Sequence, residues 1–347
     1  MIVKRGYRLL AAMALAAGLA AGLAVEARAQ KKAAPARKRP PKKKPKPKQP
    51  AYLTVETAGP DYKVQGEYVA QVAGDRTKKL GVQVIALGNG TFRACFLKGG
   101  LPGAGWDGKT KIEVDGKAEG DKTVFEGKGY EAVIKGERLQ ARAPQGQKIV
   151  GERIVRKSPT LGAKPPAGAI VLFDGSSAAE WAGGHMDKRK LLAAGTASKR
   201  KFTDFTLHVE FMTPFKPLGR GQGRGNSGVY LQHRYEIQVL DSFGLRGLDN
   251  ECGGIYKKGR PKVNMCFPPL TWQTYDIDFT APVFKDGRKI APACATVRHN
   301  GVVIHDKLKI DGKTGGSKGE EGEPGPIFLQ GHGNPVFFRN IWIVEKK

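Results

Sequence analysis

An acid and an amide stand two residues apart in YEIQVLD, residues 235–241. In a strand, successive side chains point to opposite faces, so Glu236 and Gln238 would share one face and their apolar neighbours the other. A carboxylate next to an amide can act as a general base beside a group that contacts hydroxyls. The alternative is a solvent-facing strand with ordinary polar residues, and the pattern alone leaves both open.

A second polar group is the loop QGHGN, residues 330–334, which follows an apolar strand. The glycines on either side of His332 let the backbone approach a ligand closely, and an imidazole titrates near neutral pH. His332 is therefore a candidate acid or alternate base, with Gln330 beside it. A single loop histidine is also often a plain surface residue.

Other patterns in the chain are weaker. GAGWDGKT, residues 103–110, matches the phosphate-binding P-loop, but that motif needs a helix at its end, and the following KIEVDGK alternates like a strand. We interpret the match as coincidence. The histidines lack zinc-protease spacing, so no protein-only zinc site and no cofactor are predicted. Loop carboxylates such as Asp241 and Asp249 leave a Ca²⁺ site open.

These residues must be positioned by strands. From about residue 166 to the end, short alternating segments follow one another without a long helical period, and Asn300-Gly301 between ATVRH and VVIHD is a strong hairpin signal. Many antiparallel strands at this spacing predict a two-sheet sandwich. Residues 311–325, acidic and rich in glycine, are expected to form a long surface loop.

The first half of the chain predicts a separate all-β domain. Its segments are short, alternate, and are bounded by Gly, Asp or Lys, and a hairpin is expected around Gly88-Asn89-Gly90. The stretch SPTLGAKPPA, residues 158–167, indicates a linker. We therefore expect a small all-β domain of unknown function at 51–160 and the sandwich at 161–347.

The N-terminus has the pattern of an export signal: basic residues, an apolar run from Leu9 to Val25, and small residues before a cleavage point after Ala29. Residues 1–29 are thus predicted to be removed, which implies a periplasmic or secreted protein and no membrane span afterwards. The alternative is an uncleaved anchor.

The four cysteines could include a Cys252–Cys266 disulfide or could all be buried thiols.

The net charge of +27 is concentrated in a tail, because residues 1–50 hold 14 basic residues and one acid. Residues 30–50 are rich in Lys, Arg and Pro and are expected to be extended and disordered. The segment 31–48 could contact an anionic envelope or polysaccharide, or serve as a solvated spacer. With half the charge in this tail, a nucleic-acid-binding domain is not indicated.

A series of blocks in the second half resembles the 3-keto-disaccharide hydrolase domain family. The blocks occur in order and span residues 168–347: LFDG, FTDFTLHVEF, GNSGVYLQ, YEIQVLDS, CGGIY, WQTYDIDF, VRHNGVVIHD and GPIFLQGHGNPVFFRNIWI. The resemblance implies a concanavalin A-like (jelly-roll) β-sandwich, in agreement with the strand pattern. It does not cover residues 51–157.

The resemblance also implies a reaction. A sugar with a ketone at C3 has an acidic C2 hydrogen, so a base can remove it, the C1 aglycone can leave by elimination, and water can add to the resulting enone. This route needs one base, a donor for the leaving oxygen and a group that stabilises the enolate. It does not need the paired carboxylates of ordinary glycosidases.

The site residues implied by this resemblance are Glu236 as general base and His332 as acid or alternate base. Ligand contacts are assigned to six further residues, each of which also has a simpler interpretation as a local, core or ion-pairing residue: Asn226, Gln238, Asp241, Tyr256, Gln330 and Arg339. Tyr256 is the candidate for stacking on a pyranose ring.

One position departs from the family pattern. Relatives commonly have Asp where this chain has Gly331, so a carboxylate partner for His332 is missing. Three functions therefore stay open: an exported enzyme that cleaves 3-keto-glycosides, a non-catalytic lectin-like module, and an envelope scaffold held by the basic tail.

Overall fold

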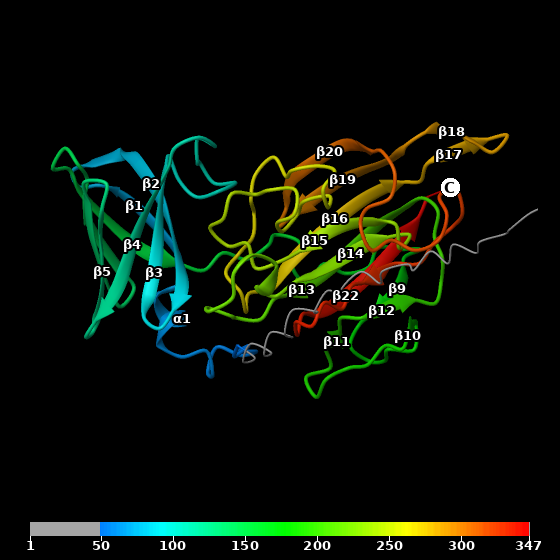
Figure 1. Cartoon of the computed structure of the whole chain (residues 1–347), viewed down its shortest axis with the longest axis horizontal. Helices are drawn as coiled ribbons and strands as arrows, with labels where there is room; N and C mark the ends of the chain where they lie inside the picture. Colours follow the sequence, from blue (N-terminus) through cyan, green and yellow to red (C-terminus); the bar gives the residue numbers. More distant parts are fainter. Residues whose placement is uncertain (1–48, 347) are drawn as a thin grey trace, which may run out of the picture. The chain divides into compact units, whose positions relative to one another are not determined.

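The computed structural model describes residues 49–346 (Figure 1). The predicted signal segment and nearly all of the basic tail lie outside the described residues. Between residues 49 and 346, no helix is long and apolar enough to cross a membrane.

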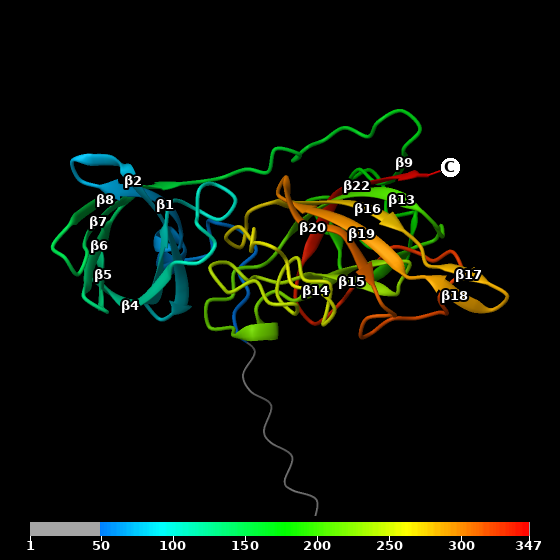
Figure 2. The ribbon, with the colours of Figure 1, turned by 90° about the horizontal axis from the view of Figure 1, so that it is seen from above.

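The first half is a closed antiparallel barrel of eight strands in sequence order (Figure 2). A five-residue helix, α1 (Pro60–Val64), precedes it. The strands are β1 (Gly66–Val72), β2 (Asp75–Gly88), β3 (Thr91–Lys98), β4 (Lys111–Glu119), β5 (Lys122–Gly127), β6 (Tyr130–Lys135), β7 (Arg138–Arg142) and β8 (Lys148–Ile154). The all-β prediction for this half is confirmed, but β8 was missed because KIVGERI alternates poorly.

The P-loop-like residues 103–110 are irregular and lead directly into strand β4, without the helix that phosphate binding would need. The interpretation of this match as coincidence agrees with the structure. The hairpin at Gly88-Asn89-Gly90 is present, and Asn89 and Gly90 have φ values of 54° and 70°, as a tight β-turn requires.

Close approach of the backbone at Gly81 gives a stability prediction. A Cβ atom there would lie 2.5 Å from the carbonyl carbon and oxygen of Gly100. Because moving the backbone of Gly100 would disrupt its surroundings, Gly81→Ala is expected to lower the free energy of unfolding by about 2 kcal/mol in urea denaturation. Gly223→Ala, which meets nothing within 4 Å, is the control. Equal midpoints for the two variants would contradict the prediction.

The second half is a sandwich of two antiparallel sheets. The smaller sheet has the order β10-β12-β21-β14-β15, and the larger has β11-β22-β13-β16-β19-β20 with β9 against β22. The smaller sheet consists of β10 (Trp181–Ala182), β12 (Thr196–Ser198), β21 (Phe328–Leu329), β14 (Ser227–Leu231) and β15 (Tyr235–Val239). The larger consists of β11 (Leu192–Ala193), β22 (Phe337–Glu345), β13 (Phe205–Met212), β16 (Gln273–Thr280), β19 (Ala293–His299), β20 (Val302–Ile310) and β9 (Ile170–Phe173).

Alternation along the strands builds the sandwich core. Phe205, Leu207, Val209 and Phe211 of β13 point into it, and so do the apolar residues of β15. The polar residues of β13 therefore face outward from the larger sheet, and Glu236 and Gln238 face outward from the smaller one. The predicted all-β sandwich is confirmed, and each sheet carries one polar outer face.

Some short elements were missed from sequence. They are β10, β11, β12, the turn η1 (Gly221–Gly223), and a hairpin of β17 (Val283–Lys285) and β18 (Arg288–Ala291). The Asn300-Gly301 hairpin forms as predicted between β19 and β20. All four cysteines are free thiols, so the Cys252–Cys266 disulfide does not form; three of them are buried as the second alternative expected, whereas Cys294 is half-buried.

Candidate functional site

A polar pocket of about 280 Å³ lies on the outer face of the smaller sheet. Six of the eight predicted site residues line it, together with Gln222, Tyr230, Gly315 and Gly316. The six are Glu236, His332, Asn226, Gln238, Tyr256 and Gln330. Residues far apart in sequence thus meet at one place, and nearly all of them are uncharged hydrogen-bonding groups.

Glu236 faces Tyr230 directly across the β14–β15 pair. The tyrosine Oη lies 2.8 Å from Oε2 of the carboxyl group. The neighbouring Gly228 leaves room for the acid, because a Cβ there would lie 2.5 Å from Oε1 of Glu236. The glycine of GNSGVYLQ is therefore part of the site.

Burial decides the protonation of Glu236. Its side chain is 2% exposed, and removal from water raises its pKa to about 7, against a smaller lowering by the hydrogen bond from Tyr230. Burial and then the Glu236 charge raise the pKa of Tyr230 well above its usual range, so it stays a neutral hydroxyl. A carboxyl group with this pKa can both take and return a proton near neutral pH.

The amide side chains form a connected network at the pocket wall. Gln222 Oε1 accepts hydrogen bonds from Nδ2 of Asn226 at 2.9 Å and from Nε2 of Gln238 at 3.0 Å. The side-chain amide oxygens of Asn226, Gln238 and Gln330 are buried and have no hydrogen-bond partner within residues 49–346. Such oxygens call for hydrogen-bond donors, which the hydroxyls of a sugar supply.

His332 is exposed at the pocket, in the irregular stretch after β21. In the described part of the chain, no carboxylate contacts its ring. The preceding Gly331 packs closely on Gly195: a Cβ at 331 would lie 3.0 Å from the Gly195 Cα. A side chain at 331 would thus press on the backbone of another segment, so the departure from the family pattern fits its local surroundings.

Two predicted ligand contacts do not reach the pocket. Asp241 is buried and bound by Nε and Nη2 of Arg224 at 3.0 and 2.7 Å, which occupies it as a structural ion-pair partner. Arg339 lies on β22 of the larger sheet, pairs with Glu210 at 2.7 Å and stacks on Trp272. Both were placed from sequence blocks, which do not show on which sheet or face a side chain lies.

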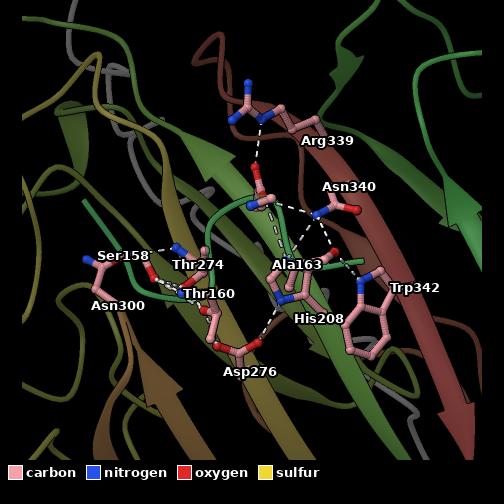
Figure 3. Close-up of polar contacts among 12 residues, drawn as sticks. Ser158, Thr160, Ala163, His208, Thr274, Asp276, Asn300, Arg339, Asn340 and Trp342 are labelled. Atoms are coloured by element: carbon pink, nitrogen blue, oxygen red, sulfur yellow. Dashed lines mark hydrogen bonds and ion pairs between the residues drawn. The ribbon is translucent and has the colours of Figure 1, made fainter. Parts of the chain in front are cut away.

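Arg339 belongs to a buried polar cluster on the outer face of the larger sheet (Figure 3). His208 there donates to Asp276 at 2.6 Å and lies 3.6 Å from Glu210. The linker segment 158–163 covers the cluster: Thr160 donates its hydroxyl to Asp276 and the Gly162 N–H binds Glu210. The linker is thus fixed to the sandwich by charged groups.

The contacts within this cluster shift the pKa values of His208 and Glu210. Burial would lower the pKa of His208, but the hydrogen bonds and charges of Asp276 and Glu210 raise it above its ordinary value. Burial would raise the pKa of Glu210, but hydrogen bonds from His208, Asn340, Gly162 and Arg339 lower it to about 2. The cluster therefore holds opposite charges at mildly acidic pH, below the ordinary histidine pKa of 6.5.

Comparison with known families gives a match over residues 168–344, just over half of the chain, to the 3-keto-alpha-glucoside-1,2-lyase-like domain. The chain belongs to this family. The resemblance described from the sequence blocks is confirmed, and membership makes the protein a carbohydrate-active one. Among curated proteins there is no match.

Solved structures similar to this family member come from Parabacteroides distasonis ATCC 8503. One, described as a putative glycosyl hydrolase, is 37% identical, covers 52% of this chain and 85% of its own, and has a TM-score of 0.48. Two more with the same description are 17% and 20% identical, with TM-scores of 0.38 and 0.37. They cover 52% and 51% of this chain and 95% and 99% of their own.

The sequence blocks that identify the family did not point to every residue of the pocket. Tyr230 was missed, although Val229 and Leu231 in the core would have placed it on the outer face with Glu236. Gly315 and Gly316 were assigned to a surface loop, whereas they form one wall of the pocket. Gln222 lies in a Gly/Arg-rich loop without a strand period and carries no such signal.

No three His, Cys, Asp or Glu side chains of residues 49–346 come together in a way that could hold a metal ion. Of the two carboxylates considered for Ca²⁺, Asp241 is paired with Arg224 and Asp249 is half-buried in a loop.

Proposed function

We propose that this protein cleaves 3-keto-glycosides by proton abstraction, elimination and hydration. The observation that carries the proposal is Glu236: a single buried carboxyl group with a pKa of about 7, in a pocket otherwise lined by neutral hydrogen-bonding groups. A base of this pKa suits removal of a proton next to a ketone at neutral pH. Family membership supplies the substrate class.

In the proposed reaction, ionised Glu236 takes the C2 proton and the electron pair moves toward the C3 oxygen. The C1–oxygen bond then breaks, a C1=C2 double bond forms, and the aglycone takes a proton from His332 and leaves as an alcohol. Water adds its hydroxyl to C1 and gives its proton back to His332, while the proton on Glu236 returns to C2. The products are the aglycone and a free 3-keto sugar, with no glycosyl–enzyme intermediate.

The other pocket residues have supporting roles in this proposal. The unpartnered amide oxygens of Asn226, Gln238 and Gln330 accept from sugar hydroxyls, and the free amide hydrogens are available to the enolate oxygen. Tyr256 offers its ring to the sugar. His332, exposed at the pocket, is the candidate donor to the leaving oxygen.

The direct test is a time course with 3-keto-glucosides beside the same glucosides unoxidised at C3, following released aglycone and enone absorbance. Cleavage of only the keto sugars, with a transient enone, is expected. Hydrolysis of the unoxidised sugars without an enone, or no turnover by folded protein, would contradict the proposal.

The rate should rise with pH. Because the base acts when ionised and burial raises the Glu236 pKa to about 7, kcat/KM is expected to increase tenfold per pH unit below that value and to level off above it. A profile measured from pH 5 to 9 on one keto substrate checks this. A nearly constant rate from pH 5 upward, as a carboxyl group with the ordinary pKa of 4.5 would give, would exclude a buried base.

One observation favours a second function, non-catalytic glycan binding. Gly331 replaces the family's usual Asp, and His332 has no carboxylate partner in the described part of the chain. A lectin-like module would bind oxidised and unoxidised glycosides with similar Kd and release no aglycone. Calorimetric titration with both, beside the turnover assay, separates the two functions.

We also propose export to the periplasm or outside the cell, on the N-terminal signal pattern, and contact of segment 31–48 with anionic envelope material. Deleting residues 31–48 should abolish co-sedimentation with cell-envelope fractions at low salt. Unchanged sedimentation would argue against this contact, and with it against the scaffold alternative.

A further inference from the structure

The 311–326 segment, which connects β20 to β21, is tied to the edge of the smaller sheet at β15. Thr314 donates both its N–H and its hydroxyl to the Arg234 carbonyl, at 2.9 and 3.0 Å, and its Oγ1 accepts the Glu236 N–H at 2.9 Å. Lys318 N–H binds the His233 carbonyl at 2.8 Å. Gly315 and Gly316, between these ties, form the pocket wall.

Tyr230 on β14 also contacts this segment, but its hydroxyl group has one hydrogen and two acceptors within reach. Its Oη lies 2.8 Å from Glu236 Oε2 and 2.7 Å from the Gly315 carbonyl oxygen, and both could accept its hydrogen. Nε2 of Gln330 donates to the same Oη at 3.1 Å. A phenol has a single hydrogen, so both acceptors can be satisfied only if Glu236 itself is protonated.

The two protonation states of Glu236 therefore give two hydrogen-bond patterns. When the carboxyl group is protonated, it donates to Tyr230, and Tyr230 donates to Gly315. When the carboxyl group is ionised, it accepts the hydrogen bond of Tyr230 in place of the Gly315 carbonyl, because a hydrogen bond to a charged acceptor is the stronger one. The Gly315 carbonyl then loses its tie to β14.

We propose that Tyr230 is a positioning residue whose single hydrogen couples the proton on Glu236 to the pocket wall. Protonation of Glu236 ties Gly315 to β14 and fixes the 311–326 segment. Ionisation releases that tie. Gly316 makes the close approach possible, because it has a φ of 75° and a Cβ there would lie 2.8 Å from the Tyr230 Oη.

This inference deepens the proposed function and rests on it for one step, the gain of the C2 proton by Glu236. At that moment the wall would be fixed around the enone, and it would loosen again once the proton returns to C2. The wall thus holds the intermediate during hydration. The coupling itself needs no substrate, so it can be tested independently of turnover.

Other titratable groups near Glu236 and Tyr230 must be separated from this effect. Tyr256 and His332 line the same pocket, and the His233 ring lies 5.9 Å from that of Tyr230. Burial, with the charges of Lys318 and Arg234, lowers the pKa of His233, so it titrates on the acid side of its ordinary value. The 311–326 segment also carries Lys313, Lys318 and the acids Asp311, Glu320, Glu321 and Glu323.

The test is amide hydrogen exchange of peptides within 312–320 of the full chain, expressed as protection factors from pH 5.5 to 8.5. One hydrogen bond of ordinary strength should make protection about fivefold higher below pH 7 than above it. Tyr230→Phe should stay at the lower level throughout, and Glu236→Gln should lose the pH step. Residues 130–135 of β6 report any global change.

Two histidine variants serve as matched controls. His233→Asn and His332→Gln should both keep the pH step, because neither removes the Glu236 proton. A step that survives in Tyr230→Phe, or that disappears in His233→Asn, would overturn the inference, and so would constant protection in the wild type. Failure of the keto-sugar assay with the pH step intact would reject the proposed function alone.

Discussion

Glu236→Gln should abolish cleavage of 3-keto-glycosides, with kcat lower by about 10³-fold and sugar affinity nearly unchanged. The amide has the size of the carboxyl group and can still hydrogen-bond to Tyr230, but it cannot accept the C2 proton. Aglycone release measures the turnover, and calorimetric titration with a keto sugar measures the affinity. A lectin would have no turnover to lose, so this split distinguishes the two functions.

The control for this variant is a glutamate of similar chemistry outside the pocket. Glu131 is exposed on β6 of the barrel, and Glu131→Gln should leave kcat unchanged. Protein stability should not confuse the result. Because the folded-state pKa of Glu236 is raised from 4.5 to about 7, wild type loses stability as the pH rises from 4.5 to about 7, so Glu236→Gln should be no less stable than wild type at pH 8. Turnover retained within threefold would remove Glu236 from the mechanism.

The largest stability effect is expected at the cluster on the larger sheet. Glu210→Gln should lower the free energy of unfolding by about 3 kcal/mol, because it removes a buried negative charge from between His208 and Arg339. It also turns an amide donor toward groups that are themselves donors. Urea denaturation at pH 5.5 measures this loss.

The pH dependence follows from both shifts. Glu210 has a lowered pKa, so its contribution is full above about 4.5 and is lost as the pH falls toward 2. His208 has a raised pKa, so its contribution is full below about 6.5 and is lost as the pH rises through its folded-state value. The difference between Glu210→Gln and wild type should be largest between these limits.

A surface ion pair provides the comparison for Glu210. Glu180 pairs with Arg200 at 3.0 Å, and both side chains are largely in solvent. Glu180→Gln should change the free energy of unfolding by less than about 0.5 kcal/mol. Similar losses for Glu180→Gln and Glu210→Gln would mean that the cluster stabilises no more than exposed charges do.

Strand alternation made most of the sandwich predictable. Apolar and polar residues of β13 alternate from Phe205 to Phe211, as in a half-buried strand, and the Asn-Gly turn identified the hairpin of β19 and β20. β10 and β11, with two residues each, could not be found, because a period of two leaves no repeat within two residues. Closure of the barrel also escaped prediction: it depends on pairing of β1 with β8, which are far apart in sequence.

The site was predictable where a residue lies on a regular strand. Glu236 and Gln238 were placed on one outer face, and the structure puts both in the pocket. Arg339 has the same kind of strand position, but on the other sheet, and alternation says nothing about which sheet a strand joins. The wall formed by Gly315 and Gly316 depends on backbone atoms, which residue types do not reveal.

The linker segment 158–163 packs on the larger sheet and so is part of the folded sandwich. The family match starts at residue 168, yet Glu210 and Asp276 depend on groups from Thr160 and Gly162 for part of their hydrogen bonding. A fragment starting at 168 would leave charged groups of the larger sheet facing water in place of the backbone and hydroxyls that now cover them. The segment that is homologous to the family thus begins at residue 168, whereas the segment needed for a stable sandwich includes the linker from about residue 158.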